Sequence, residues 1–453
     1  MKFIVIGITD CPHPFFPPEV LDIIKRGKVF SGGKRHHEIV APLLPDGAEW
    51  IDITMPLDKV FEHYSLTSHL SPLTSQIIVF ASGDPLFFGF ANTIRRKMPE
   101  AEVVVYPSFN SLQMLAHRLL LPYHDMRIVS LTGRPWPEFD RALIERAPKI
   151  GILTDREHTP AAIAQRMLDY GYTAYQMHVG EHLGNPALER VTTLTLEEAA
   201  EREFQMPNCV ILSPLTSHHS PLTPHLSPLT SHLSPLTPFG LPDTSFALLD
   251  GREKMITKMP IRLLTLQALD LPHRHVLWDV GFCTGSVSIE ARLLFPHLQI
   301  EAFEIRPECE AIIRENMRRH GALGIGIHIG DFCLTPGPSP TGEGSSQSHR
   351  KNATEIPSTP LSSWRGAGGE APPDAVFIGG HGGRLKEIMA KAKQHLRPGG
   401  IIVMNSVKAP RVTTDSHQLW DEACRELGLR QHPATHITIN DYHPITILKC
   451  ELP

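Results

Sequence analysis

The sequence predicts an α/β protein made of two bodies, and three observations support this. Short apolar runs of strand type alternate with helical patterns along the first 212 residues, as in layered α/β folds. Residues 276–305 have the pattern of a strand, a tight glycine turn, a helix and a second strand. Between the two regions, residues 213–240 form four tandem heptads that each contain proline. The prolines exclude a coiled coil and favour an extended, mobile linker.

The strand-like runs of the first half follow one another at short intervals. Lys2–Ile6 has a buried-strand pattern, and a short helix entered through proline is predicted at Pro17–Arg26. Further strands are predicted at residues 50–53, 77–81, 103–106, 127–130, 149–153, 175–179 and 209–212. Polar motifs come directly after several of these strands, where open α/β sheets place their ligands.

The second half predicts one larger sheet. Its parallel strands are expected at residues 276–280, 300–303, 325–329, 374–378 and 401–404, and its helix at residues 307–319 ends at Gly321. Two alternating runs at residues 435–439 and 445–449 predict a closing antiparallel pair. Insertions at residues 65–75 and 335–373 are expected to be surface excursions that leave the cores intact.

Composition narrows the class of protein. A chain of 453 residues is long enough for two or three domains. Its net charge of -5 provides no basic footprint for nucleic acid, and no run of 18 apolar residues predicts a membrane span. The N-terminus enters a strand pattern without the features of a signal peptide. Seven scattered cysteines indicate reduced thiols, without a disulfide framework or a metal site. We therefore expect a cytoplasmic protein.

The glycine turn of the second half predicts an adenosine site. Gly281 and Gly285 allow bare backbone and a helix N-terminus to approach a ligand. Glu304 ends the next strand about 20 residues later, where an acid binds the hydroxyls of a ribose. A dinucleotide site of the NAD type requires glycine at the positions of Cys283 and Ser286. These residues argue against an oxidoreductase, which stays an alternative together with a plain βαβ core turn.

The same turn is similar to a known cofactor motif. Asp279-x-Gly281-x-Cys283-x-Gly285 resembles the D-x-G-x-G-x-G motif of class I methyltransferases, with Cys283 in place of the middle glycine. The resemblance implies a Rossmann-like sheet over residues 241–453 that binds S-adenosyl-L-methionine. In such a site Asp279 faces the methionine ammonium, and Asp331 lies near the adenine amine.

A second resemblance covers residues 1–212. Residues 81–89 place Ser-Gly-Asp-Pro at the end of a strand, before apolar side chains that can wall a flat ligand. This stretch resembles the cofactor loop of the cobalamin-pathway tetrapyrrole methyltransferases, and further motifs follow in that family's order at residues 32–36, 107–111, 130–134, 154–160 and 180–184. The resemblance implies a fold of two α/β lobes with a cofactor site of its own. The cofactor-binding residues that it implies are Ser82, Gly83, Asp84, Pro85, Ser108, Leu131 and Thr132. The turn at residues 7–12 departs from that family's glycine-rich pattern and is assigned no role.

The motifs at residues 250–258, 330–331 and 379–383 resemble the decarboxylating precorrin methyltransferases. The whole chain thus resembles the fused precorrin C5,15-methyltransferases. This implies two S-adenosyl-L-methionine sites, a tetrapyrrole substrate such as precorrin-6B or its cobalt form, and precorrin-8 as product. The first half would methylate carbon 5, and the second would methylate carbon 15 and decarboxylate the ring C acetate. No metal is expected, and relatives of each half suggest a homo-oligomer.

A substrate with many carboxylates requires positive charge and hydrogen-bond donors. The substrate-binding candidates are Arg262 and, as backbone amides, Gly379, Gly380, Gly382 and Gly383. The catalytic candidates are Thr257, Lys258 and His381, and Lys34, Arg35 and Arg134 are candidate cations in the first half. For each cation the alternative is solvated surface charge, and His381 could instead be a structural loop residue. A non-catalytic scaffold that uses the heptads stays a further alternative.

Overall fold

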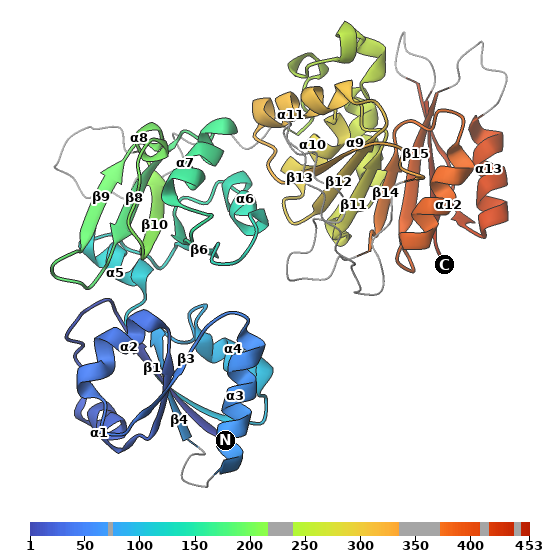
Figure 1. Ribbon diagram of the computed structural model, residues 1–453. Coiled ribbons are helices and arrows are strands. Elements are labelled where there is room, and N and C mark those ends of the chain that lie inside the picture. Colours follow the sequence, from blue (N-terminus) through green and yellow to red (C-terminus); the bar gives the residue numbers. More distant parts are fainter. Residues whose placement is uncertain (71–75, 216–238, 335–371, 408–415, 439–444) are drawn as a thin grey trace, which may run out of the picture. The chain divides into compact units, whose positions relative to one another are not determined.

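The computed structural model describes residues 1–70, 76–215, 239–334, 372–407, 416–438 and 445–453 (Figure 1). The chain divides into two compact units. The first contains residues 1–133, 147–168 and 173–222, and the second contains residues 134–146, 169–172 and 223–453. Both have α/β architecture, as predicted.

The first unit begins with a five-stranded, fully parallel sheet in the order β3-β2-β4-β1-β5. Its strands are β1 (Lys2–Ile8), β2 (Val29–Gly32), β3 (Glu49–Asp52), β4 (Gln76–Ser82) and β5 (Glu102–Tyr106). Helices α1 (Pro18–Arg26) and α2 (Lys34–Val40) cover one face, and α3 (Leu57–Leu70) and α4 (Phe90–Lys97) cover the other (Figure 1).

Strand alternation explains how this sheet buries both faces. Ile4 and Ile6 of β1 pack with residues of α1, whereas Phe3 and Val5 pack with residues of α3. Successive side chains of a strand point to opposite faces, so a strand covered by helices on both sides must be apolar throughout. The buried run at residues 2–8 therefore predicts a central strand, and β1 lies between β4 and β5.

A mixed five-stranded sheet in the order β6-β7-β10-β8-β9 follows along the chain. β6 and β7 are parallel, whereas β10 runs antiparallel to both of its neighbours. The strands are β6 (Arg127–Ser130), β7 (Ile150–Leu153), β8 (Tyr175–Glu181), β9 (Arg190–Leu194) and β10 (Asn208–Pro214). The helices of this region are α5 (Ser111–Arg118), α6 (Pro137–Ile144), α7 (Pro160–Asp169) and α8 (Leu196–Ala200).

The second unit has an eight-stranded sheet in which β13-β12-β11-β14-β15 are parallel and β18 and β16 follow antiparallel. β17 also pairs with β18, which confirms the predicted closing antiparallel pair. The strands are β11 (Val276–Val280), β12 (Gln299–Glu304), β13 (Ile325–Ile329), β14 (Ala375–Ile378), β15 (Ile401–Val407), β16 (Arg430–Gln431), β17 (Thr435–Ile437) and β18 (Ile445–Glu451).

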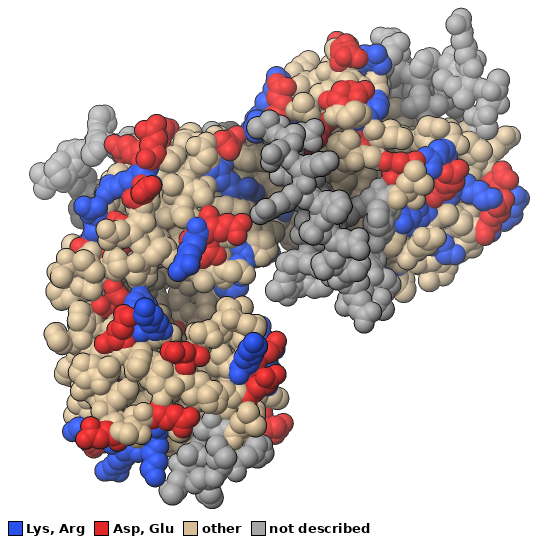
Figure 2. All heavy atoms as spheres, in the orientation of Figure 1, with Lys and Arg blue, Asp and Glu red and all other residues tan. Residues whose placement is uncertain are grey.

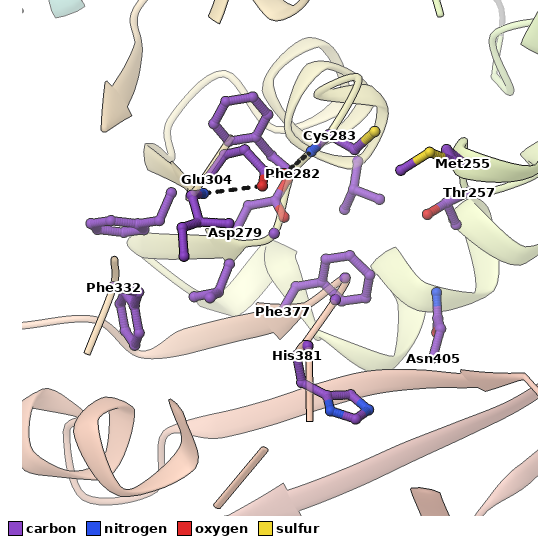
Figure 3. A pocket seen from close by; sticks show the side chains of 18 of the residues that line it. Met255, Thr257, Asp279, Phe282, Cys283, Glu304, Phe332, Phe377, His381 and Asn405 are labelled. Carbon is purple, nitrogen blue, oxygen red and sulfur yellow. Dashed lines mark hydrogen bonds between the residues drawn. The ribbon is translucent and has the colours of Figure 1, made fainter. Parts of the chain in front are cut away.

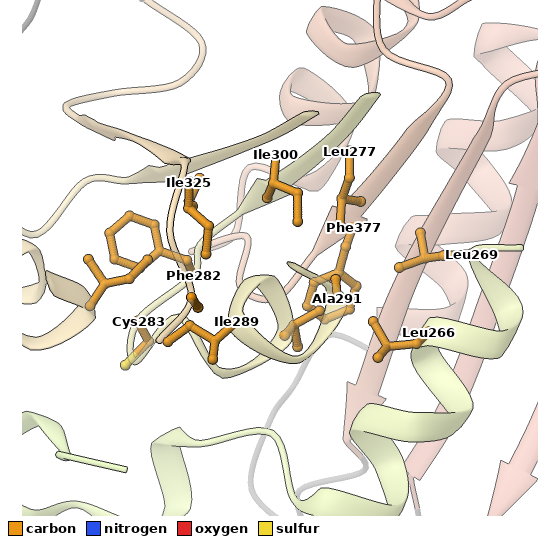
Figure 4. Close-up of a cluster of buried hydrophobic side chains, with 14 of the residues drawn as sticks. Leu266, Leu269, Leu277, Phe282, Cys283, Ile289, Ala291, Ile300, Ile325 and Phe377 are labelled. Atoms are coloured by element: carbon orange, nitrogen blue, oxygen red, sulfur yellow. The ribbon is translucent and has the colours of Figure 1, made fainter. Parts of the chain in front are cut away.

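Two apolar layers sandwich this sheet. Helices α9 (Met259–Ala268), α10 (Ser286–Leu294) and α11 (Glu308–His320) pack on one face, where Leu266, Ile289 and Ile300 are among the buried residues (Figure 4). Helices α12 (Leu385–His395) and α13 (Ser416–Leu427) pack on the other face. Gly321 ends α11 in the left-handed conformation, as its position predicts.

Some boundaries differ from the prediction. Strands β2 and β9 were not predicted from their short, mixed runs. Residues 65–70 of the expected insertion continue helix α3, and residues 71–75 lie outside the described part. Ser213 and Pro214 belong to β10 and not to the linker. Residues 216–238, which include most of the heptads, lie outside the described residues. So do residues 335–371, which make up most of the expected insertion at residues 335–373.

The surface, the thiols and the helices add three observations. Acidic and basic side chains are interspersed over the faces that are visible in Figure 2. All seven cysteines are free thiols, as predicted. Among the described residues, no helix has both the length and the apolar character needed to cross a membrane.

Candidate functional site

A cavity of about 860 Å³ lies at the carboxyl ends of β11, β12 and β14 in the second unit (Figure 3). In the view of Figure 3, Glu304 and Phe332 lie on one side, Met255 and Thr257 lie on the other, and Asp279 lies between them. The predicted residues that line it are Thr257, Lys258, Asp279, Gly281, Glu304, Asp331, Gly379, Gly380, His381 and Gly382. The predicted residues Arg262, Gly285 and Gly383 do not line it.

The glycine turn between β11 and α10 forms the floor of this cavity. Gly281, Cys283 and Gly285 have φ values of 82°, 50° and 74°. A Cβ on Gly281 would lie 2.8 Å from the amide nitrogen of Gly380, so only glycine lets these two loops meet. A Cβ on Gly285 would lie 2.4 Å from Cγ1 of Ile313 on α11. Gly285 thus permits helix packing and does not line the cavity, and its predicted contact with the cofactor stays a prediction.

Cys283 keeps the backbone geometry of the glycine that it replaces. Its left-handed φ costs a non-glycine residue about 1 kcal/mol. The strained backbone places its N–H 3.0 Å from Oε2 of Glu304, to which it donates. Burial raises the pKa of the Cys283 thiol, so the side chain stays neutral at the edge of the core (Figure 4). The replacement therefore leaves the turn tight.

Asp279 is a buried carboxyl group with one unmatched oxygen. Ser288 Oγ donates to its Oδ2 at 2.6 Å, but Oδ1 has no hydrogen-bond partner among the described residues. Burial raises the pKa of Asp279 from 3.8 to about 7, although the hydrogen bond from Ser288 acts in the opposite direction. A buried, unpaired oxygen is costly unless a ligand donates to it. An ammonium group bound in the cavity would satisfy it, so this residue fits a methionine-bearing cofactor.

Glu304 is fixed at the end of β12 by donors on both oxygens. The backbone N–H groups of Ile305 and Arg306 donate to Oε1, and that of Cys283 donates to Oε2. The Arg306 guanidinium completes the set with Nε 2.9 Å from Oε1 and Nη2 2.8 Å from Oε2. Burial alone would raise the pKa of Glu304, but the bonds from Arg306 outweigh it and lower this pKa. Glu304 is therefore a carboxylate at neutral pH.

Asp331 is paired in a similar way. Arg384 Nη1 donates to Asp331 Oδ2 at 2.6 Å, and the Cys333 N–H donates to Oδ1 at 2.9 Å. The hydrogen bond from Arg384 lowers the pKa of Asp331. Arg384 also contacts Glu387, its neighbour on α12. Both acids that were predicted to hold the adenosine thus carry an arginine that also lines the cavity.

Arg262 does not bind substrate at the mouth of the cavity, and that prediction is wrong. Its side chain is completely buried, with Nε 2.6 Å from Oε2 of Glu290. Its Nη1 donates to the Thr257 carbonyl at 2.7 Å and to Asp243, and its Nη2 donates to the Leu241 carbonyl. A buried charge needs such a full set of partners. Arg262 therefore holds the segment that brings Thr257 and Lys258 to the cavity.

The glycine loop after β14 covers another side of the cavity. Gly380 and Gly382 line it, but the Gly383 N–H donates to His381 Nδ1 at 3.1 Å and is already used. Burial lowers the pKa of His381, so its ring is neutral at pH 7. With Nδ1 accepting from Gly383, the proton lies on Nε2. His381 is therefore arranged to donate a hydrogen bond, and its predicted catalytic role stays a prediction.

In the first unit, the Ser82-Gly83-Asp84-Pro85 loop is built by close backbone contacts. Gly83 has a φ of 60°, and its N–H donates to the Ile8 carbonyl at 2.7 Å. The Ser108 N–H donates to the Gly83 carbonyl at 3.3 Å, so two predicted cofactor residues meet here. Asp84 Oδ1 accepts from the Leu86 N–H at 2.9 Å, which is the geometry of a turn-forming aspartate.

Leu131 and Thr132 follow β6 in the other sheet of this unit. Leu131 is fully buried, and its N–H donates to the Leu153 carbonyl at 2.8 Å. The Thr132 hydroxyl donates to the Thr154 carbonyl at 3.0 Å. Their cofactor roles stay predictions.

A charged cluster that includes an unassigned residue lies beside the Ser82 loop. Asp10 accepts from Arg35 Nη1 at 3.1 Å and lies 2.9 Å from His182 Nδ1. Arg35 Nη2 and His36 Nε2 both lie 2.9 Å from Ser82 Oγ. Burial and the Arg35 charge lower the pKa of His36 to about 4, so this ring is neutral. The strand ends β1, β2 and β4 thus bring together polar groups that satisfy one another.

Sequence reasoning missed several lining residues. Arg306 and Arg384 were not singled out, although each lies within the polar segment that follows a strand or a glycine loop. Asn405 also lines the cavity and forms a hydrogen bond with Thr265 through its Oδ1 at 3.1 Å. The position of Asp10 directly after β1 was a usable signal, because strand ends are ligand positions in open sheets.

Comparisons with known proteins cover both halves of the chain. Residues 2–200 match the family model described as Tetrapyrrole (Corrin/Porphyrin) Methylases, and residues 250–333 match the model described as Precorrin methyltransferase domain. A precorrin-6Y C(5,15)-methyltransferase [decarboxylating] of Sinorhizobium sp is 28% identical over 404 residues, which covers 89% of this chain and 84% of that protein.

Two shorter relatives match one half each. A cobalt-precorrin-6B C(15)-methyltransferase (decarboxylating) of Salmonella typhimurium is 34% identical over 210 residues, which covers 45% of this chain and 92% of that protein. The cobalt-precorrin-7 C(5)-methyltransferase of the same organism is 26% identical over 208 residues, which covers 46% of this chain and 97% of that protein. These relatives are all methyltransferases, and they lend no support to the oxidoreductase alternative. The chain belongs to the precorrin-6Y C5,15-methyltransferase (decarboxylating) family.

Proposed function

We propose that the protein methylates precorrin-6B, or its cobalt form, at carbons 5 and 15 and removes the carboxyl group of the ring C acetate to give precorrin-8. The first unit acts at carbon 5, and the second unit acts at carbon 15 and decarboxylates. Each unit binds its own molecule of S-adenosyl-L-methionine, so the enzyme is bifunctional.

The observation that carries this proposal is the unmatched oxygen of Asp279. It lines the same cavity as Glu304, which lies beside Asp279 in Figure 3 and would bind a ribose. An ammonium donor and a diol are the two polar parts of S-adenosyl-L-methionine that these acids suit. Asp331 would take the adenine amine beside the Phe332 ring. Met255 and Thr257 would then lie on the side where the methyl group meets the substrate.

Methyl transfer from a sulfonium to carbon requires little covalent catalysis by the protein. When bound, the sulfonium supplies the methyl group to a nucleophilic ring carbon by in-line displacement. The chain's own residues hold the reactants in line and exclude water, which is the main source of rate in such a step. Decarboxylation breaks the bond to the carboxylate carbon, and its electron pair enters the conjugated macrocycle. His381, with its proton on Nε2, would donate a hydrogen bond to an acetate in the cavity.

For the first unit, support comes from the family match and from the loops around Gly83. Ser82 Oγ accepts from Arg35 Nη2 and lies 2.9 Å from His36 Nε2, which holds this side chain beside the loops. The exposed rings of Phe88 and Phe109 flank these loops and suit a flat macrocycle.

Mass spectrometry of the product tests the proposal. The purified full-length protein is incubated with S-adenosyl-L-methionine and either precorrin-6B or cobalt-precorrin-6B. We expect a gain of two methyl groups and a loss of one carbon dioxide with one of these substrates. Titration with S-adenosylhomocysteine should also reveal two binding sites per chain. No mass change with either substrate, or fewer than two sites, would contradict the proposal.

A further inference from the structure

Arg306 and Arg384 both line the cavity, but their partners differ. All three side-chain nitrogens of Arg384 are engaged, because it contacts Glu387 in addition to Asp331. Arg306 is paired with one carboxylate, that of Glu304, through Nε and Nη2, and its guanidinium also interacts with the thiol of Cys283. Arg306 therefore depends on a single carboxylate, and that carboxylate is the one expected to bind the cofactor.

The oxygens of Glu304 have no room for further donors. Five N–H contacts already reach them, three at Oε1 and two at Oε2. A carboxylate offers about four lone-pair positions. A ribose diol would add two donors, so existing ones must leave. The three backbone N–H groups are fixed by the turn and by the end of β12, whereas the Arg306 side chain is about one-third exposed and can rotate away.

We infer that S-adenosyl-L-methionine displaces Arg306 from Glu304 and that the freed guanidinium then binds a carboxylate of the tetrapyrrole. This inference rests on the proposed function of the second unit. A guanidinium suits the task because its planar fork matches a carboxylate and because it stays charged at any working pH. A macrocycle that carries carboxylate arms on every ring can reach a cation at the rim of the cavity.

Charge in the cavity supports the exchange. Asp279, Glu304 and Asp331 line it with Lys258, Arg306 and Arg384, so acids and bases balance before any ligand binds. The cofactor brings a net positive charge and occupies the acids. The cavity then holds an excess of positive charge that attracts an anionic substrate. Cofactor binding therefore prepares the substrate site, and we expect the cofactor to bind first.

The test compares Arg306→Gln with Arg306→Lys and with a matched control. Arg314 on α11 also donates through Nε and Nη2 to one carboxylate, that of Glu310, but it lies outside the cavity. Two quantities are measured for each full-length variant. Calorimetry gives the Kd of S-adenosylhomocysteine at the second unit without any tetrapyrrole, and kinetics give the KM for the tetrapyrrole that the wild type methylates at carbon 15.

We expect Arg306→Gln to raise this KM by about 10- to 100-fold, as loss of a charged hydrogen bond does, with no loss of cofactor affinity. Arg306→Lys should keep most of the substrate affinity, and Arg314→Gln should match the wild type. The inference is overturned if Arg306→Gln weakens S-adenosylhomocysteine binding, since Arg306 would then support Glu304, or if its KM is unchanged. Failure of the proposed function is a different result, namely no turnover by the wild type.

Discussion

The two units are expected to bind the same cofactor, yet their polar groups are prepared in different ways. In the second unit, Asp279 keeps a buried oxygen without a partner and so has a position waiting for a cation. In the first unit, Asp10, Arg35 and Ser82 satisfy one another, and Asp84 caps its own loop. If both units bind the cofactor as proposed, the second site would rely on a buried charge and the first on the fit of backbone loops.

The largest expected effect tests the buried charge. Asp279→Asn should weaken cofactor binding at the second unit by about 100-fold or more, because a buried ammonium would lose its counter-charge. Calorimetry with S-adenosylhomocysteine should then detect one site in place of two. Methylation at carbon 15 and loss of carbon dioxide should disappear, while methylation at carbon 5 of a suitable substrate continues. Loss of both activities would show that the two sites are not independent.

The next effect tests the backbone fit of the first unit. A Cβ on Gly7 would lie 1.9 Å from the Gly83 carbonyl oxygen, so Gly7→Ala should push the cofactor loop away. We expect the free energy of unfolding of the first unit to fall by about 2–4 kcal/mol. The methylation activity expected of this unit should be lost as well. Gly133→Ala is the control, because its φ of 61° brings strain but its Cβ meets nothing within 4 Å. Differential scanning calorimetry measures the stability of both variants. Equal losses in Gly7→Ala and Gly133→Ala would contradict the steric argument.

The pH dependence of the two sites should also differ. Asp279 must be ionised to bind an ammonium, and its pKa in the free protein is about 7. Cofactor affinity at the second unit should therefore fall about tenfold for each pH unit below 7. His36, with a pKa of about 4, stays neutral from pH 6 to 8 and adds no such dependence at the first unit. Titrations with S-adenosylhomocysteine across this range test the difference, and a flat profile at both sites would contradict it.

The same carboxyl group links stability to pH. Its folded-state pKa lies above the usual 3.8, so the folded protein holds the extra proton between about pH 4 and 7. The contribution of Asp279 to stability therefore decreases as pH rises through this window. Asp279→Asn should remove this decrease and make the second unit more stable than the wild type at pH 8.

The smallest effect concerns the strained turn. Cys283→Gly should remove the backbone strain of the left-handed φ of 50°. It should also make the unfolded chain more flexible, so we expect the free energy of unfolding to change by less than about 1 kcal/mol. Cofactor affinity should hold, because the N–H that donates to Glu304 is kept. Chemical denaturation and calorimetry together measure both quantities. A clear loss of affinity would mean that the Cys283 side chain, which lines the cavity, takes part in binding.

Sequence patterns predicted the features that repeat at fixed spacing. The sheet strands, the glycine turn and the acids at strand ends depend on neighbours along the chain, so Asp279 and Glu304 were found and do line the cavity. Strands β2 and β9 could not be predicted, because their runs of four and five residues mix polar and apolar residues and show no clear strand pattern.

Partners brought together by the fold could not be predicted in the same way. The pairing of Arg262 with Glu290 joins residues that are 28 positions apart, and that of Arg384 with Asp331 joins residues that are 53 apart. The one usable signal for Arg262 was its place before Thr265 and Leu266, which share its buried helix face. Gly285 was predicted from its motif, but only the path of α11 shows that it meets Ile313.

The buried pair of Arg262 and Glu290 has a practical consequence. Glu290 accepts the N–H groups of Gly240 and Leu241, and Arg262 donates to the Leu241 carbonyl. A shortened protein that starts after Leu241 would lack these contacts. The buried charges of Arg262 and Glu290 would then lose part of their hydrogen-bond partners. An isolated form of the second unit should therefore begin upstream of Gly240, and a later start should yield insoluble material.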